Sequence, residues 1–227
     1  MEYRAEASTL EGFVQQLAVC YVARGYWFYV SGVVPPHKDP RRLDAKLIER
    51  YRITSSKFER ARRKASGLAN VQYIRFGDRF FLLATAGEHR FVREEPGILD
   101  CREVPLKFGG YAIGYRGGHA QVRIERGAWK WLRSYYVDLA TKRSVGWFAT
   151  EFRRWPYEPY APIRQQTFII LNQVNRARKA AGLELVPTSC VRIKRRIYRP
   201  FEEPVAAESV GGCLAEKRVA LDQVGDL

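Results

Sequence analysis

Apolar residues near the start of the chain recur with the three- and four-residue spacing of an amphipathic helix. Ser8 and Glu11 match a capping box, in which a serine hydroxyl and a glutamate carboxylate each bind a free backbone N–H at a helix start. Gly25 suits the left-handed conformation that ends a helix. The pattern predicts a helix between these residues, with an apolar face made by Leu10, Phe13, Val14, Leu17, Ala18 and Tyr21.

Strand and helix patterns alternate beyond this first helix. Residues 26–31 are aromatic and β-branched, which predicts a strand, and residues 71–75 and 79–85 predict a hairpin around a Gly-Asp turn. Ser56 and Glu59 form a second capping box and open a further helix. A shorter helix before it is marked by Leu43, Leu47, Ile48 and Tyr51. The helix that Ser56 opens is expected to turn three residues toward the core: Phe58, Ala61 and Ala65.

The second half of the chain again mixes both patterns. Strands are expected at 101–107 and 111–124, and two adjacent glycines, Gly117 and Gly118, favour a hairpin within the second strand segment. The helices expected after them are indicated by apolar periodicity over 129–140, a cap at Ser144 and a first-turn proline at Pro162, with a stop at Gly182.

Basic residues dominate the charge and are unevenly distributed. The 227 residues include 39 Lys and Arg against 24 Asp and Glu, for a net charge of +15. Residues 41–64 carry ten basic and three acidic side chains, whereas 202–227 carry a net charge of −4, which leaves +19 on residues 1–201. A protein this basic commonly meets an anionic partner, and nucleic acid is the commonest. An acidic protein, a membrane surface or solubility alone would also account for the charge.

Composition narrows the class of protein. A hydrophobic share of 46% predicts an ordered core, and no apolar run approaches the roughly 18 residues of a membrane span. The first residues do not match a secretory signal, and the four cysteines form no CxxC pair, so a cytoplasmic chain with reduced thiols is expected. We expect an α+β protein with units at 1–95 and 96–201, the latter a β-hairpin plus helices, and an acidic, mobile tail at 202–227.

Over about residues 9–86, the order helix, strand, helix, helix, strand, strand resembles that of a winged helix-turn-helix. Ile53 falls at the apolar turn position of this family, and Phe58 and Ala61 fall at the buried positions of its recognition helix. Arg52 stands where the family usually has glycine. A positive φ is uncommon for other residues, so the turn is expected to be built differently here.

The resemblance implies a DNA-binding surface on the third helix. With its apolar side turned inward, the basic side chains of this helix form one exposed stripe, which suits guanine edges or phosphates in a major groove. Arginines on both sides of the hairpin tip are placed to contact the adjacent DNA backbone. The stripe equally matches the solvated face of an ordinary amphipathic helix. The residues concerned are Lys57, Arg60, Arg63 and Lys64 on the helix, and Arg75 and Arg79 on the hairpin.

A second basic segment lies at residues 191–199. If this segment is a strand, four alternate side chains share one face, and a basic face with an aromatic suits a nucleic-acid backbone and a stacked base. An edge strand protected by charges would have the same pattern. The four residues are Arg192, Lys194, Arg196 and Tyr198.

One catalytic alternative stays open. His119 and Gln121 lie in a predicted strand with both side chains on one face, and Tyr135 and Tyr136 follow on a helix. This arrangement resembles HUH-type rolling-circle nucleases, which implies a Mg²⁺ or Mn²⁺ ion held by the histidine and glutamine and a tyrosine that attacks a phosphate. A surface histidine beside a turn and a core Tyr136 would match the same residues.

The sequence favours a nucleic-acid-binding protein, with duplex DNA preferred, that serves replication, partition or regulation of a mobile element such as a plasmid. It has no nucleotide-hydrolysis motif and no paired carboxylates typical of a two-metal nuclease, so an enzyme is disfavoured and no cofactor or metal is expected. The alternatives are the metal-dependent, tyrosine-using nuclease and an RNA- or protein-binding scaffold subunit. The expected partner is nucleic acid rather than a membrane, and a homodimer is left open.

Overall fold

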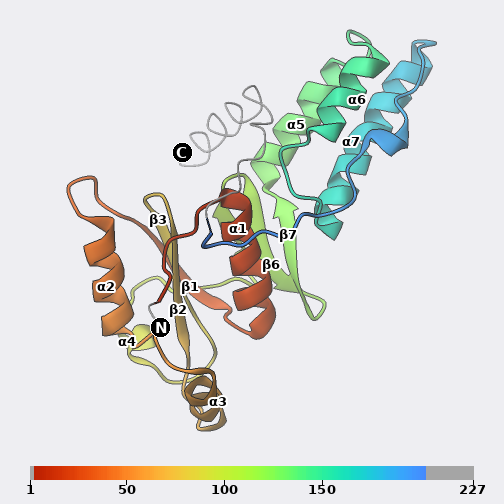
Figure 1. Ribbon diagram of the computed structural model, residues 1–227. Coiled ribbons are helices and arrows are strands. Elements are labelled where there is room, and N and C mark those ends of the chain that lie inside the picture. The colour runs from red at the N-terminus through yellow and green to blue at the C-terminus, as the bar shows by residue number, and fades with distance from the viewer. Residues whose placement is uncertain (1–2, 203–227) are drawn as a thin grey trace. The chain divides into compact units, whose positions relative to one another are not determined.

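The computed structural model describes residues 3–202 and has a mixed α+β structure, as expected (Figure 1). These residues divide into two compact units. Unit 1 comprises residues 3–106, 113–120 and 198–202, and unit 2 comprises residues 107–112 and 121–197. Within residues 3–202, no helix combines the length and the apolar character needed to cross a lipid bilayer. The acidic tail expected at 202–227 lies, apart from Glu202, outside the described residues.

Unit 1 is built from one sheet and several short helices. The four-stranded sheet has the order β2-β3-β1-β4, and neighbouring strands in it run antiparallel. Phe28 of β1 lies opposite Ala84 of β3 on one side and Asp100 of β4 on the other. The elements are α1 (Leu10–Gln15), the π-helical η1 (Gln16–Tyr21), the 3-10 turn η2 (Val22–Arg24), β1 (Phe28–Val33), α2 (Pro40–Arg50), α3 (Lys57–Ala65), β2 (Val71–Phe76), β3 (Arg79–Ala84), α4 (Arg90–Glu94) and β4 (Leu99–Asp100).

Helices cover both faces of this sheet, with α1 and α2 on opposite sides (Figure 1). On the α1 face, the ring of Phe13 lies 5.9 Å from those of Phe76 and Phe81. Because both faces are covered, β2 and β3 are buried at nearly every position rather than at alternate ones. The core on the α2 face is formed by Ala5, Leu47, Tyr51, Ile53, Val71, Tyr73, Leu82, Ala84 and Phe91.

A buried ionic network ties β2 to α2 and to the N-terminal segment. The Arg75 side chain is only 3% exposed, and its guanidinium donates to both carboxylate oxygens of Asp44 at 2.9–3.2 Å and to those of Glu6 at 3.0 Å. It also donates to the Gly77 carbonyl at 2.6 Å, while the Tyr73 hydroxyl donates to Asp44 at 2.5 Å. Every donor group of this arginine therefore serves the fold, so Arg75 is buried rather than placed on the surface beside the hairpin tip.

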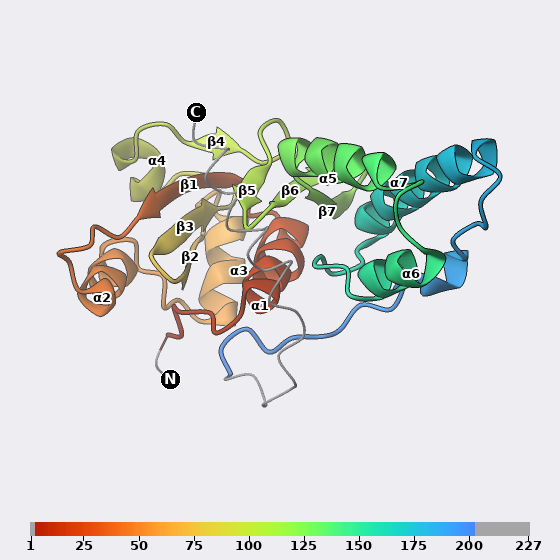
Figure 2. The same cartoon turned by 90° about the horizontal axis from the view of Figure 1, so that it is seen from above.

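Unit 2 is mainly helical. Its helices α5 (Arg126–Asp138), α6 (Val145–Arg153) and α7 (Ala161–Ala180) are followed by the 3-10 turn η3 (Thr188–Cys190). Helix α5 packs along α7 (Figure 2), where the Arg133 side chain donates to Gln173 at 2.7 Å. A three-stranded sheet with the order β5-β6-β7 is formed by Leu106–Phe108, Tyr111–Arg116 and His119–Ile124, and the division assigns its residues partly to unit 1 and partly to unit 2. The hairpin turn expected at Gly117 and Gly118 is confirmed, since both glycines have positive φ.

Aromatic rings and one arginine hold the helices of unit 2 together. The buried Tyr136 ring lies 5.6 Å from Phe152 and 5.4 Å from Trp155. Arg178 of α7 is 4% exposed, and its guanidinium donates to the carbonyl oxygens of Glu184, Ala140 and Arg143 at 2.6–2.7 Å. The last two carbonyls follow the C-terminal end of α5, so the arginine joins two helix ends that are distant in the sequence.

Some local expectations are confirmed and others are wrong: the strand expected at 101–107, for example, is a turn over 101–104 followed by β5. Gly25 is left-handed, Ser144 caps α6, and Pro162 lies in the first turn of α7. The first helix, however, is capped by Thr9, whose hydroxyl accepts from the Gly12 N–H at 3.1 Å. Ser8 instead donates to the Pro200 carbonyl at 3.2 Å, so the capping box predicted there does not form.

Another error concerns residues 191–199. This segment is irregular rather than a strand, and its side chains do not share one face. Arg192 is partly buried and pairs at 2.9 Å with the buried Glu158, whose carboxylate also accepts from the Arg196 N–H at 3.0 Å. This segment is therefore held by contacts with the Glu158 carboxylate rather than by hydrogen bonds to a neighbouring strand.

Candidate nucleic-acid interface

Helix α3 is attached to unit 1 without a single buried residue. Its start is fixed by the expected capping box, in which the Ser56 hydroxyl accepts from the Glu59 N–H at 3.2 Å and Glu59 accepts from the Ser56 N–H at 2.6 Å. Hydrogen bonds from the Ser56 N–H and hydroxyl lower the pKa of the Glu59 carboxyl. The negative charge of Glu59 is thus engaged at the first turn.

Two arginines, not apolar side chains, hold the inner side of α3. The Arg60 guanidinium donates to the Ser55 carbonyl at 2.5 Å, and that of Arg63 donates to the Ala69 carbonyl at 2.8 Å. The Asn70 side chain returns a hydrogen bond to the Arg60 carbonyl at 2.9 Å. Both arginines are partly buried. They are occupied by the protein's own backbone, so the prediction that they belong to one exposed stripe is wrong.

The opposite side of α3 faces solvent. Phe58 is 83% exposed, and Ala61 and Ala65 are exposed as well, which contradicts the prediction that these three residues face the core. Nine residues with one large apolar side chain offer little surface to bury, whereas the two arginines satisfy backbone carbonyls and can pack their aliphatic stems. The cations on the exposed side are Lys57, Arg62 and Lys64.

Arg62 is the member of this exposed set that the sequence pattern did not single out. It belongs to the run Arg62-Arg63-Lys64, in which neighbouring residues point about 100° apart on a helix. Placing Phe58 in the core made Arg63 the outward residue of the run. The run itself signals a basic helix, but only the packing decides which of its members are exposed.

The turn between α2 and α3 has the backbone geometry that glycine usually supplies. Arg52 has a φ of 49° and is the only non-glycine residue with positive φ among the described residues. The Ile53 N–H donates to the Ile48 carbonyl at 3.0 Å and the Arg52 N–H to the Glu49 carbonyl at 3.1 Å, the paired bonds of a Schellman motif. Ile53 is buried, as expected for the turn. The expectation that Arg52 changes the turn is therefore wrong, because Arg52 adopts the left-handed conformation.

This conformation gives a prediction about stability. A residue other than glycine in the left-handed conformation costs about 1–2 kcal/mol. Replacing it with glycine recovers only part of this free energy, because glycine also makes the unfolded chain more flexible. Arg52→Gly should therefore raise the free energy of unfolding by about 0.5–1 kcal/mol in urea titrations. Lys46→Gly, at an exposed position within α2, is the matched control and should lower it by about 0.5–1 kcal/mol. Destabilisation by Arg52→Gly would contradict the described turn.

His89 is a titratable residue near the turn between α2 and α3, at the start of α4. Its Nδ1 accepts from the Phe91 N–H at 2.9 Å, which caps α4, and its ring lies 6.3 Å from that of Tyr51. Burial lowers the pKa of His89 from its ordinary value of 6.5, and the positive charge of Arg63 lowers it further. The ring is therefore held neutral in the folded chain at neutral pH.

The lowered pKa predicts a pH dependence. Below pH 6.5 the unfolded His89 takes up a proton that the folded residue does not accept. The free energy of unfolding should therefore be fully retained above pH 6.5 and fall as the pH drops toward the lower pKa of the folded state. Urea titrations at several pH values should show a smaller fall for His89→Gln, whereas His37→Gln, which changes an exposed histidine, should behave like the parent. Equal slopes for all three proteins would contradict this.

The two arginines of the hairpin do not lie beside the exposed cations of α3, contrary to the expectation. Strand β2 begins next to α3, and at about 3.3 Å per residue its six residues carry the chain about 17 Å toward the tip. At the tip, the Asp78 carbonyl accepts from the Val34 N–H at 2.7 Å. Arg79 is exposed at this far end of the hairpin and Arg75 is buried, so neither joins the cations of α3.

The basic residues after 190 also differ from the prediction. Lys194 and Arg196 are exposed, Tyr198 is partly buried, and Arg192 is held in its ion pair with Glu158. The Tyr198 backbone N–H donates to the Gln15 side chain at 3.2 Å. These four residues do not form the single basic face that a strand would give.

The residues of the catalytic alternative have different surroundings. His119 is exposed at the start of β7, and Gln121 is partly buried with its side chain bonded to Arg123 at 3.1 Å. The Tyr136 hydroxyl is in the core and donates to Glu151 at 3.0 Å, so it is not placed to attack a phosphate. Tyr135 stacks on Trp131 at 5.1 Å. Within residues 3–202, no three His, Cys, Asp or Glu side chains come together as a metal-binding group.

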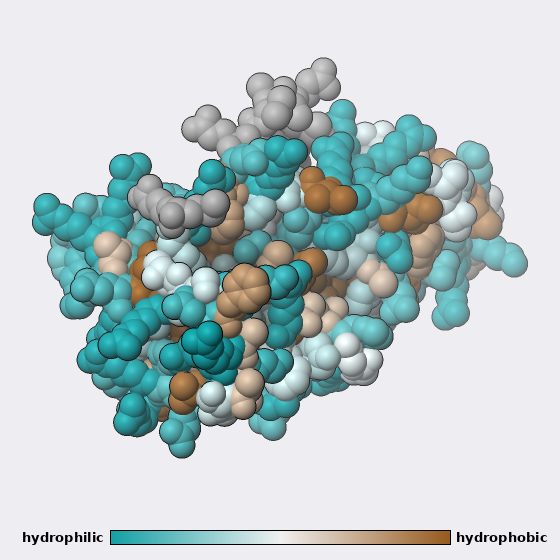
Figure 3. Space-filling view, turned by 60° about the horizontal axis from the view of Figure 1, so that its bottom comes forward, coloured by the Kyte–Doolittle hydropathy of each residue, from teal (hydrophilic) through white to brown (hydrophobic). Residues whose placement is uncertain are grey.

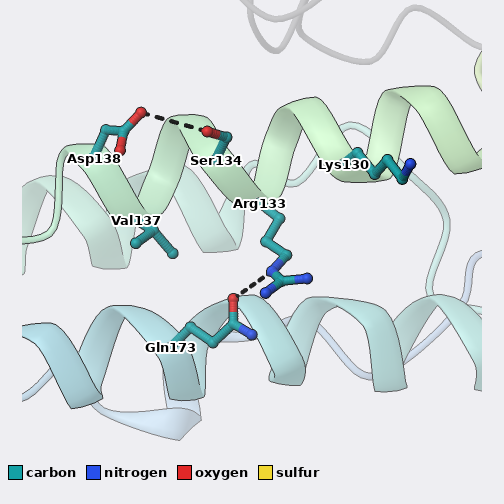
Figure 4. Close-up of a pocket in the computed structure, with 6 residues that line it drawn as sticks. All are labelled: Lys130, Arg133, Ser134, Val137, Asp138 and Gln173. Atoms are coloured by element: carbon teal, nitrogen blue, oxygen red, sulfur yellow. Dashed lines mark hydrogen bonds between the residues drawn. The ribbon is translucent and has the colours of Figure 1, made fainter.

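A surface hollow of about 320 Å³ lies between α5 and α7 in unit 2 (Figure 4). Its lining mixes cationic, acidic and neutral groups, and Arg133 reaches across it to Gln173. Among its six lining residues there is neither histidine nor cysteine, and the Ser134 hydroxyl donates to the Asp138 carboxylate at 3.5 Å. The lining residues are Lys130, Arg133, Ser134, Val137, Asp138 and Gln173.

The exposed side of α3 is thus the candidate interface. In the lower left of Figure 3, where the end of unit 1 that carries α3 in Figure 1 comes forward, the surface is mostly hydrophilic with isolated apolar residues. We call Lys57, Phe58, Ala61, Arg62, Lys64 and Ala65 the outer face of α3. Comparison of the chain with protein-family models, with curated proteins and with solved structures found no match in any of the three.

Proposed function

We propose that this chain binds duplex DNA through the outer face of α3, as a replication, partition or regulatory factor of a mobile element. The observation that carries the proposal is the exposure of α3. None of its residues is buried in the core, and three cations project from its exposed side. A B-DNA major groove accepts one α-helix, and lysine and arginine on it meet guanine edges or phosphates.

Charge and local geometry support this proposal. The chain carries a net charge of +15, and α3 belongs to a segment with ten basic and three acidic residues. The one acidic residue of α3, Glu59, is engaged at the capped first turn. Repulsion of DNA phosphates is therefore weakest along the remaining turns.

The connection of α2 to α3 supports a helix-turn-helix arrangement. The turn has the left-handed residue and the buried apolar residue typical of this motif, at Arg52 and Ile53. The element order and the strand order β2-β3-β1 also suit a winged helix. The packing of α3 is different, because arginine–carbonyl hydrogen bonds replace the apolar contacts expected for the recognition helix.

Two charge-matched variants test the proposal. The triple variant Lys57→Ala/Arg62→Ala/Lys64→Ala removes three exposed cations from α3, and Lys142→Ala/Arg176→Ala/Lys179→Ala removes three exposed cations from unit 2. Fluorescence anisotropy with labelled duplex DNA at several salt concentrations should show weaker binding by the α3 variant. Its slope of log K against log salt should be shallower than the parent's by up to about three units, roughly one for each phosphate that the variant no longer neutralises.

The control decides whether the site or only the net charge matters. The unit 2 variant has the same net charge as the α3 variant and should retain most of the parent's affinity. Equal weakening by both variants would contradict a site on α3. Tighter binding of single-stranded DNA or RNA than of duplex would contradict duplex DNA as the partner.

A further inference from the structure

The outer face of α3 has the opposite polarity to that of an ordinary surface helix. An amphipathic helix turns its apolar side toward the core and its charged side toward water. In α3 the half-buried positions are Arg60 and Arg63, whereas Phe58 is 83% exposed. Ala61 and Ala65 continue the exposed apolar strip. The apolar strip is therefore available to a partner.

The surroundings of Phe58 indicate the chemistry of that partner. Lys57 precedes Phe58, and Arg62 lies one turn further on the same side of the helix. The partner must therefore offer apolar groups and negative charge within the width of one helix. The major groove of duplex DNA does so, because the C5-methyl groups of thymine project into it between two rows of phosphates.

We propose that Phe58, with Ala61 beside it, contacts the C5-methyl groups of thymine in the major groove, while Lys57 and Arg62 contact the flanking phosphates or guanine edges. The inference rests on the proposed function and assigns its base preference. An anionic lipid surface is the competing partner. It suits α3 less well, because a nine-residue helix with one large apolar side chain presents a narrow apolar face, whereas helices that lie in a membrane interface present a broad one.

A pair of duplexes that differ only in the thymine methyl tests this proposal. One duplex alternates adenine with thymine, and the other alternates adenine with uracil. The parent should bind the thymine duplex more tightly, by about fourfold for each methyl group that it buries, since one buried carbon contributes about 0.8 kcal/mol. Phe58→Ala should lose most of this preference, because only Ala61 is left to contact the methyl groups, and Phe58→Leu should retain more of it.

Two controls accompany the measurement. Phe58→Ala should unfold at the same urea concentration as the parent, because Phe58 is 83% exposed, so loss of the preference cannot reflect unfolding. Ile169→Ala removes a comparably apolar side chain that is 43% exposed on α7, and this variant should keep the parent's preference. Both variants are assayed as the full chain.

The outcomes separate this inference from the proposed function. Duplex binding by the parent without discrimination between thymine and uracil would overturn the role of Phe58 and leave the proposed function standing. So would a thymine preference that Phe58→Ala retains in full. Failure of the parent to bind either duplex would overturn both. Binding to phosphatidylserine vesicles that Phe58→Ala abolishes, without duplex binding, would assign the outer face to a membrane instead.

Discussion

Replacing Arg75 with methionine should lower the free energy of unfolding by about 3–5 kcal/mol, the usual cost of removing one partner from a buried ion pair. Methionine fills much of the same volume but leaves Asp44, which is 7% exposed, without the cation that it faces. It also removes the link to Glu6, where the N-terminal segment joins β2. Urea titrations followed by circular dichroism measure the change.

Arg79→Met is the matched control for this prediction. Arg79 lies on the same hairpin as Arg75 but is exposed, so its replacement should change the free energy of unfolding by less than about 0.5 kcal/mol. Equal effects of the two substitutions would contradict the structural role of Arg75. A fall in DNA affinity with Arg79→Met alone would restore the hairpin as a contact surface.

Arg178→Met should lower the free energy of unfolding by about 3–4 kcal/mol. Hydrogen bonds from a charged donor each contribute about 1.5–3 kcal/mol, partly offset by the cost of burying the guanidinium. The substitution leaves the carbonyl oxygens of Ala140, Arg143 and Glu184 without this donor, beside the buried ring of Phe148. Heat or urea unfolding of the full chain, followed by tryptophan fluorescence, measures the effect.

The control for Arg178 lies two residues earlier on the same helix. Arg176 is exposed, so Arg176→Met should leave the free energy of unfolding within about 0.5 kcal/mol of the parent value. A small effect of both substitutions would show that water or neighbouring N–H groups satisfy the three carbonyls. That result would contradict the inference that Arg178 joins the C-terminal ends of α5 and α7.

Signals that act within a few residues were predictable from the sequence. The capping box at Ser56, the cap at Ser144 and the left-handed glycines all depend on hydrogen bonds or φ angles that a short segment determines by itself. The cap of the first helix was wrongly assigned to Ser8, because its neighbour Thr9 offers an equivalent hydroxyl and a short segment does not distinguish the two. The choice between two neighbouring caps depends on Pro200, which is distant in the sequence.

The side of α3 that faces the protein could not be predicted in this way. Periodicity gave the correct helix but favoured Phe58 as the inward residue, because apolar residues usually face the core. The inward side is instead decided by two carbonyls, at Ser55 and Ala69, that arginines satisfy. The burial of Arg75 likewise depends on Asp44, which lies 31 residues away and whose proximity only the folded chain reveals.

The most direct test of the outer face of α3 is a photocrosslink to DNA. Phe58 is replaced with p-benzoylphenylalanine and the full chain is irradiated with labelled duplex, and the same replacement at the exposed Ile169 serves as the control. The account predicts a covalent protein–DNA adduct from position 58 that unlabelled duplex suppresses, and little adduct from position 169. A protein that binds duplex but crosslinks at position 169 and not at position 58 would contradict it.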